Sequence, residues 1–244
     1  MSLNEWIKEK DRKTADRMAA EENYFLLSPT RTGLTHVLFP LIEKHIHGLC
    51  LDAGAGRGAY HARLAQNAEE VIRMDLHRRE GLEACGSVLD LPWRDNAFES
   101  IFCSQVLEHV PEPGRALAEF FRCLKPGGVL VLSAPHLAYL HNEPHDYFRF
   151  TRHGLAFLLS QAGFTKCEII PAGGLVSFVG HIPSVVVKAI FADLPLLGPM
   201  VMAGNRGYSR LVAWIDRRLD RKKLFALNYG VVAHKPGGGT TTGD

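Results

Sequence analysis

The residues best suited to hold a ligand lie in the stretch LDAGAGRGAY, residues 51–60. Three glycines, Gly54, Gly56 and Gly58, alternate there directly after an apolar run that is typical of a strand. Glycine costs roughly 0.5–1 kcal/mol relative to alanine inside regular structure. A tight turn needs only one glycine. Three of them therefore predict a strand-to-helix turn at which a ligand comes close to the backbone.

Two types of cofactor fit this loop. As GxGxxA, with Gly54, Gly56 and Ala59, it matches a dinucleotide-binding fingerprint, and Asp75 follows about twenty residues later, where an acid would hold the ribose. These features alone fit NAD and other adenosine cofactors equally. Asp52, which precedes the first glycine, separates them. A carboxylate is a poor neighbour for pyrophosphate at a helix N-terminus and a good one for an ammonium group.

A family resemblance rests on the loop, on Asp75 and on two later stretches, GSVLDLPWRDNAFESIFCSQVLEHV and RCLKPGGVLVLSAP. In this order, they resemble the class I S-adenosylmethionine-dependent methyltransferases, type 11-like, over residues 45–170 and the last strand. The resemblance implies S-adenosyl-L-methionine as cofactor. It also implies an α/β, Rossmann-like, doubly wound sheet of seven strands, mostly parallel with an antiparallel last strand. About fifty residues precede that strand, far more than a simple connection needs, and they predict a helical insertion there.

The resemblance also assigns cofactor-binding residues. The methionine part would lie near Asp52 and the loop residues Gly54, Ala55, Gly56 and Gly58. The ribose hydroxyls would donate to Asp75, beside Leu76, since a carboxylate can accept from a vicinal diol. The adenine amino group would meet Asp90, with Val88 or Leu89 lining the ring. Backbone oxygens near Ser104 and Gln105 would meet the amino group. A strand-end cap at Asp75 and a turn-forming role for Asp90 stay open.

The acceptor side falls on SAPHLAYLHNEPHDYFRFT, residues 133–151. Methyl transfer mainly needs alignment, and a hydroxyl or amine acceptor can also need a general base. We expect one of His136, His141 and His145 to be that base, and His109 in LEHV could also approach the acceptor. A metal site is disfavoured, because the histidine spacings match no compact ligand pattern.

The segment DYFRFT, residues 146–151, is similar to one found in a subgroup of these methyltransferases that is often linked to glycan or envelope biosynthesis. It points to a sugar-containing or lipid-linked acceptor. For the protein as a whole we expect methyl transfer to an oxygen or nitrogen of a small-molecule, sugar-containing or lipid-linked acceptor. A structural role is the alternative: Arg149 would pair with Asp146 or Glu143, and Thr151 would cap the next helix.

Apolar and amphipathic runs alternate in a way that predicts a parallel sheet covered by helices. We expect strands over 48–53, 69–76, 99–107, 126–135, 166–172 and 227–235. Helices are expected over 4–22, 32–47, 59–67, 113–125 and 151–164, with Gly127 and Gly128 ending the fourth and Gly163 the fifth. The predicted organisation is N-terminal helices in 1–48, a cofactor-binding core in 49–174, a helical insertion in 175–225, the last core strand in 226–236 and a disordered tail in 237–244.

The insertion is apolar, but polar residues interrupt it, and Pro183, Pro195 and Pro199 are expected to break a continuous helix. Three roles stay open: packing over the active site or sheet, pairing in a homodimer, and contact with a membrane surface. RLVAWIDRRLDRKK, residues 210–223, is a basic amphipathic stretch with Trp214. Such a helix either lies at a membrane surface or faces solvent.

Composition narrows the classes of function. The 244 residues are 46% hydrophobic and 22% charged with a net charge of +2, which indicates a globular protein and gives no reason to expect nucleic acid. The N-terminal stretch has no apolar signal core, and the five cysteines, without a CxxC pair, are typical of reduced core residues. We expect a cytoplasmic protein, with a peripheral place at the inner membrane face left open. An NAD(P)-dependent oxidoreductase and a non-catalytic cofactor-binding subunit remain alternatives.

Overall fold

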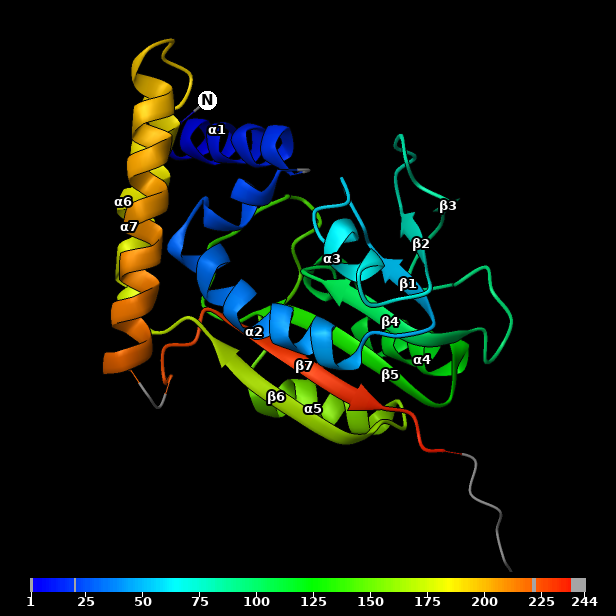
Figure 1. Cartoon of the computed structure of the whole chain (residues 1–244). Helices are drawn as coiled ribbons and strands as arrows, with labels where there is room; N and C mark the ends of the chain where they lie inside the picture. The colour runs from blue at the N-terminus through cyan, green and yellow to red at the C-terminus, as the bar shows by residue number, and fades with distance from the viewer. Residues whose placement is uncertain (1, 20, 221–222, 238–244) are drawn as a thin grey trace, which may run out of the picture. The chain divides into compact units, whose positions relative to one another are not determined.

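The computed structural model describes residues 2–19, 21–220 and 223–237 (Figure 1). The chain divides into two compact units. One, here called the helical unit, comprises Met1–Val37, His136–His141 and Pro171–Tyr229. The other, the sheet unit, comprises Leu38–Pro135, Asn142–Ile170 and Gly230–Asp244. Of the predicted disordered tail, all but Gly237 lies outside the described residues.

The sheet has seven strands in the order β3-β2-β1-β4-β5-β7-β6. They are β1 (Leu49–Ala53), β2 (Glu70–Asp75), β3 (Ala84–Cys85), β4 (Phe98–Ser104), β5 (Leu124–Pro135), β6 (Thr165–Ala172) and β7 (Asn228–His234). The β1–β2, β1–β4, β2–β3 and β4–β5 pairs are parallel. β7 is the antiparallel strand. The predicted seven-stranded mixed sheet is confirmed. β1 lies at the switch point of the strand order, with β2 and β3 on one side and β4 and β5 on the other.

The core of the sheet unit comes from the near-continuous apolar runs of the central strands, as both-sided burial in a parallel sheet requires. Ile101 and Phe102 of β4 and Leu130 and Leu132 of β5 are fully buried. The flanking helices are α3 (His61–Ala65), α4 (Pro113–Cys123) and α5 (Arg152–Gln161). Thr151 caps α5, accepting from the Gly154 amide at 3.0 Å as the sequence predicts.

The helical unit contains α1 (Leu3–Met18), the 3-10 turn η1 (Glu22–Leu26), α6 (Leu175–Phe191) and α7 (Leu197–Leu219). The helix α2 (Pro29–His45) belongs partly to each unit. On α7, small and apolar residues are buried at heptad-like spacing, from Gly198 through Met202 to Val212, and α6 packs beside them. A buried ion pair at 2.6 Å joins Lys188 of α6 to Asp11 of α1.

Several local predictions are wrong. β3 was missed because two residues carry no periodicity. Gly127 and Gly128 do not end a helix: α4 stops at Cys123, and both glycines lie in β5, where the β4–β5 register shifts between Phe98 and Ser100. Pro183 lies inside α6 rather than breaking it, and only Pro195 falls between two helices. Cys85 and Cys167 are exposed, while Cys50, Cys103 and Cys123 are buried.

Candidate functional site

The glycine loop joins β1 to α3 in the sheet unit. The amides of Gly54 and Ala55 both donate to the Met74 carbonyl of β2, at 2.8 and 2.9 Å. Gly54 has a φ of +82°, and a Cβ there would lie 2.4 Å from Cγ2 of Val106. Gly56 has a φ of +58°, but nothing lies within 4 Å of where its Cβ would be. The loop is therefore fixed on its inner side and open above Gly56.

Asp75 ends β2 beside this loop. Its Oδ2 accepts from the Gly56 amide at 2.9 Å and its Oδ1 accepts from the His77 amide at 3.1 Å. Each carboxylate oxygen can accept more than one hydrogen bond, so both keep capacity for hydroxyl donors. The neighbouring Leu76 is exposed and offers an apolar surface next to the carboxylate. This arrangement fits the ribose-binding role predicted for Asp75.

Asp52 is buried in β1, directly before the loop. Burial raises the pKa of its carboxyl group to about 7, and the positive charge of Arg73 only partly opposes this. Arg73 is itself paired with Glu83, 2.6 Å from Nη2 to Oε1. A buried carboxyl group that ionises near neutral pH can gain its charge when an ammonium group arrives.

Asp90 and Leu89 lie in the segment after β3. Asp90 is exposed and Leu89 half-buried. A short turn forms here: the Leu89 amide donates to Oγ of Ser87 at 3.1 Å, and the Asp90 amide donates to the Ser87 carbonyl at 3.2 Å. The turn-forming role that the sequence left open for Asp90 is thus present in the structure.

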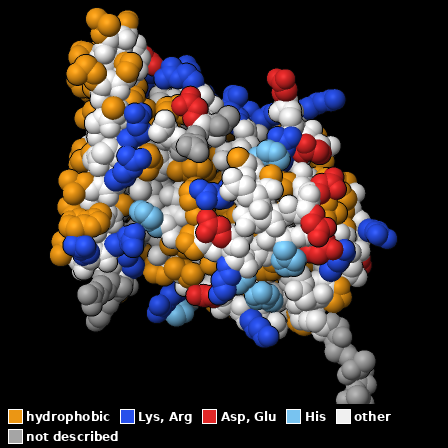
Figure 2. Space-filling view, viewed as in Figure 1, with side chains coloured by type: hydrophobic (Ala, Val, Ile, Leu, Met, Phe, Trp, Pro, Cys, Tyr) orange, Lys and Arg blue, Asp and Glu red, His pale blue; other side chains and the backbone are white. Residues whose placement is uncertain are grey.

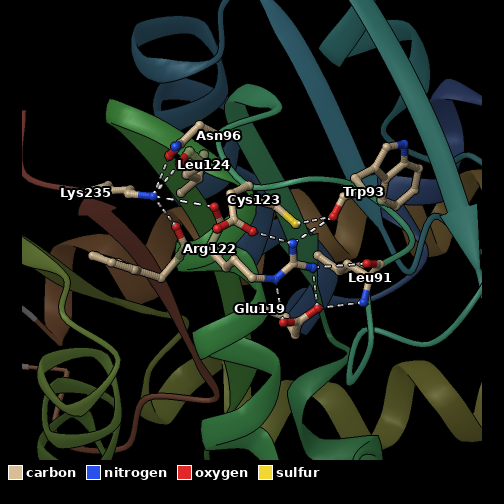
Figure 3. A network of polar contacts seen from close by, with 10 residues as sticks. Leu91, Trp93, Asn96, Glu119, Arg122, Cys123, Leu124 and Lys235 are labelled. Carbon is tan, nitrogen blue, oxygen red and sulfur yellow. Dashed lines mark hydrogen bonds and ion pairs between the residues drawn. The ribbon is translucent and has the colours of Figure 1, made fainter.

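A polar network holds this segment against α4 (Figure 3). Arg122 donates to the Trp93 carbonyl at 2.7 Å and to the Leu91 carbonyl at 3.1 Å, while it pairs with Glu119 at 2.7 Å. Glu119 in turn accepts from the Leu91 amide at 2.8 Å. The guanidinium of Arg122 can fix the backbone just after Asp90 because it carries several donors in one plane.

The end of β4 is anchored to β5. Gln105 has a φ of +57°, which stops the strand at Ser104. The Gln105 amide donates to the Ser133 carbonyl at 3.0 Å, and its Nε2 donates to Oγ of Ser133 at 3.1 Å. Oγ of Ser104 lies 2.9 Å from the same hydroxyl. These contacts hold the chain reversal that leads to Val106, the residue packed on Gly54.

A short 3-10 turn, η2 (Leu107–His109), follows. Nδ1 of His109 lies 2.6 Å from the carbonyl oxygen of His145, and the amide of Asn142 lies 3.5 Å from its Nε2. The Glu108 side chain is completely buried, and its burial raises the pKa of the carboxyl group to about 8. The Glu108 carbonyl accepts from the Tyr147 amide at 2.8 Å. Sequence reasoning missed Glu108, although an acid between Leu107 and His109 directly after a core strand was the available signal.

The three predicted histidines belong to different units. His145, in the sheet unit, lies beside His109, with its Nδ1 3.0 Å from the Tyr147 hydroxyl. His136 and His141 belong to the helical unit. There His136 packs on Tyr229 at a ring distance of 5.5 Å, and Nδ1 of His141 lies 3.1 Å from the Tyr139 carbonyl.

The DYFRFT segment has a structural role, as one of the two interpretations expected. Asp146 and Arg149 form a two-point ion pair, 2.6 and 2.7 Å, with the Asp146 carboxylate buried. Its neighbour Tyr147 is bound through its backbone to Glu108. These contacts hold residues 145–150 against η2 and place the His145 carbonyl group beside His109.

Comparisons with known proteins agree with this fold. Residues 51–132 match the family model described as "Methyltransferase domain". Demethylmenaquinone methyltransferase of Renibacterium salmoninarum is 34% identical over 93 residues, 34% of this chain and 39% of the relative. 24-Methylenesterol C-methyltransferase 2 of Arabidopsis thaliana is 34% identical over 133 residues, 44% of this chain and 37% of the relative. The matches thus span less than half the length of these relatives.

Solved structures share the fold at low identity. Phosphoethanolamine N-methyltransferase 2 of Haemonchus contortus, in complex with S-adenosyl-L-methionine, has a TM-score of 0.58 and 14% identity, over 92% of this chain and 56% of that chain. The [4+2]-cyclase SpnF has a TM-score of 0.57 and 22% identity, over 82% and 80%. The fold is therefore the α/β, Rossmann-like methyltransferase fold, and residues 51–132 are similar to a methyltransferase domain.

Proposed function

We propose that this protein binds S-adenosylmethionine and transfers its methyl group to an oxygen or nitrogen of a small acceptor molecule. The observation that carries the proposal is the contact of Gly56 with Asp75: a backbone amide of the open glycine loop orients a carboxylate at the end of the neighbouring strand. In a Rossmann-like sheet, this is where an adenosine cofactor binds, at the carboxyl ends of the strands beside the switch point.

The sheet unit supplies a residue for each part of the cofactor. Asp75 and Leu76 take the ribose, and Asp90 with Leu89 takes the adenine. Asp52, with Gly54, Ala55, Gly56 and Gly58, takes the methionine part, together with backbone groups at Ser104 and Gln105. The bound cofactor supplies an electrophilic methyl group whose neutral leaving group needs no acid.

The remaining chemical task is removal of a proton from the acceptor. A neutral imidazole carries a proton on one nitrogen and accepts on the other. His109 donates through Nδ1 to a carbonyl, which leaves Nε2 as the acceptor. We therefore place His109 ahead of His136, His141 and His145 as the base. The likeness of DYFRFT to a glycan-linked subgroup favours a sugar-containing or lipid-linked acceptor.

Calorimetric titration tests cofactor binding directly. The protein is titrated with S-adenosylhomocysteine and, separately, with NAD. Binding of S-adenosylhomocysteine alone supports the proposal, whereas binding of NAD alone would establish the oxidoreductase alternative. Formation of S-adenosylhomocysteine from S-adenosylmethionine, measured over a panel of hydroxyl and amine acceptors, then identifies the acceptor.

A second candidate is a protein that binds the cofactor without transferring its methyl group. The observation that favours keeping it is the structural likeness to a protein named as a [4+2]-cyclase. Tight binding of S-adenosylhomocysteine, with no methyl transfer to any acceptor class, would support it over the first proposal.

A further inference from the structure

The outer face of α6 is apolar along its whole length. Every exposed residue from Leu175 to Phe191 has an apolar side chain, and Ile182 at the centre is 61% exposed. The charged residue of α6, Lys188, is 2% exposed and paired with Asp11. The outward face of a helix in a water-soluble protein is normally polar, and a continuous exposed apolar patch marks an interaction surface.

The neighbouring helix α7 adds apolar residues and arginines to this surface. Met200 is 72% exposed, and Leu211 and Trp214 lie further along the helix at 54% and 50%. Arg210, Arg217 and Arg218 are exposed beside them. Figure 2 shows the hydrophobic side chains along these two helices, with basic side chains among them.

The acidic groups within and between α6 and α7 are either buried or paired with basic residues. The acid within α6 and α7, Asp216, is buried and accepts from the Val176 amide at the start of α6, at 3.0 Å. Asp193, in the connection between the helices, pairs with Lys10 at 2.5 Å and with Arg17. The exposed surface of α6 and α7 is therefore apolar with a positive charge.

Trp214 and Arg218 form the contact expected at a boundary between lipid and water. The guanidinium carbon of Arg218 lies 4.0 Å from the centroid of the Trp214 ring. Trp places an apolar ring at the level of lipid headgroups, and arginine extends its charge toward phosphate while its stem covers apolar surface.

We propose that α6 and α7 together form a docking surface for an anionic phospholipid membrane. The apolar face enters the headgroup boundary, and Arg210, Arg217 and Arg218 contact lipid phosphates. In this proposal the two helices lie along the membrane surface. None of the described helices has the length and apolar character that a membrane span requires. Charge argues against a second copy as the occupant, since pairing the same patch of two copies would bring together two positively charged surfaces.

Co-sedimentation of the full chain with vesicles tests the proposal. Vesicles of equal parts phosphatidylcholine and phosphatidylglycerol are compared with phosphatidylcholine alone, at low and high salt. We expect binding to the anionic vesicles only, weakened by salt because the attraction is screened. Arg210→Gln/Arg217→Gln/Arg218→Gln should weaken partitioning roughly a hundredfold, since each basic residue near the surface contributes about a factor of five.

A charge-matched triple variant in the sheet unit, Arg79→Gln/Arg94→Gln/Arg152→Gln, is the control and should keep the binding. Trp214 fluorescence gives a second readout: vesicles should shift it to the blue, and Trp214→Phe should remove that shift. Failure to bind anionic vesicles at low salt would overturn the proposal. So would equal losses in the two triple variants, or a dimer in solution whose contact protects α6 and α7 from hydrogen exchange. None of these outcomes depends on methyl transfer.

Discussion

Nδ1 of His109 lies 2.6 Å from the carbonyl oxygen of His145, although the two residues are 36 positions apart. A carbonyl oxygen only accepts, so Nδ1 carries the proton and the neutral ring presents Nε2 as a base. The side-chain amide nitrogen of Asn142 lies 3.5 Å from Nε2. This nitrogen is a donor, which agrees with an Nε2 that carries no proton. His145 thus orients His109 through its backbone carbonyl group. The His145 side chain takes no part in this contact.

The first prediction separates these two histidines. His109→Ala should lower kcat roughly 10²–10⁴-fold, the usual loss on removing a general base. It should leave the dissociation constant of S-adenosylhomocysteine within about twofold, because the cofactor contacts lie elsewhere. His145→Ala, which keeps the carbonyl, is the matched control and should stay close to the parent rate. The reverse order of losses would make His145 the base.

The second prediction concerns Asp75. Asp75→Ala should weaken S-adenosylhomocysteine binding at least tenfold, about 1.4 kcal/mol, because two hydroxyl donors lose their acceptor in a partly buried site. Glu70→Gln removes an exposed carboxylate from the other end of the same strand and should bind as the parent does. Calorimetry measures both, and an unchanged affinity in Asp75→Ala would remove Asp75 from the site.

Much of this site could be predicted from the sequence because its signals are local. The apolar run before the glycines and the acid at the end of the next strand follow from strand periodicity, and parallel pairing then brings Asp75 to Gly56. The contact between His109 and His145 could not be predicted, since it depends on how the chain between them folds back. The burial of Glu108 likewise depends on residues distant in sequence.

In the helices too, local features could be predicted, and features that depend on tertiary contacts could not. The cap at Thr151 is a property of neighbouring residues and was predicted, whereas α6 continues through Pro183 against the local rule. Its packing on α7 and α1, with the buried pair of Lys188 and Asp11, outweighs the cost that proline imposes on an isolated helix. Tertiary contacts of this kind leave no periodic signal in one segment.

A third prediction follows from Asp52, whose pKa is raised to about 7. In the free protein the carboxyl group is protonated below that pH, and an ammonium group beside it favours the ionised form, so binding releases a proton. The affinity for S-adenosylhomocysteine should therefore rise with pH up to about 7, by at most tenfold per unit, and then level off. Asp52→Asn should abolish this slope. Titrations in buffers of different ionisation enthalpy count the released proton, and a parent protein that releases none contradicts the prediction.

A fourth prediction concerns Arg122, which holds the Leu91 and Trp93 carbonyls. Arg122→Ala should lower the free energy of unfolding by about 2 kcal/mol, because it leaves these carbonyls and Glu119 without their donor. Arg122→Lys should recover little, since lysine cannot reproduce several donors in one plane. Urea unfolding measures both. Arg115→Ala on the exposed face of the same helix is the control, and an equal loss there would assign the effect to the helix rather than to the network.

The last prediction concerns how the stability of the unliganded protein depends on pH. Burial raises the pKa of Asp52 to about 7 and that of Glu108 to about 8, whereas both groups ionise near pH 4 in the unfolded chain. The folded protein therefore holds more protons than the unfolded chain, and its free energy of unfolding falls as pH rises through this window, by at most about 1.4 kcal/mol per pH unit for each group. Histidines with a lowered pKa, such as His181 at about 4, act in the opposite direction but only below the pKa of an unfolded histidine, about 6.5.

Urea unfolding at about pH 7 and about pH 8 measures mainly the carboxyl groups, because above about pH 7 the histidines are mostly neutral in both states. We expect lower stability at the higher pH. Glu108→Gln should flatten the decline, since the amide cannot ionise, and Glu112→Gln, an exposed neighbour, should leave it unchanged. Saturating S-adenosylhomocysteine should remove the share that belongs to Asp52 and spare the share that belongs to Glu108, because an ammonium group offsets the buried charge of the first residue alone. Stability that rises over this pH range in the parent would show that neither carboxyl group is buried in its neutral form.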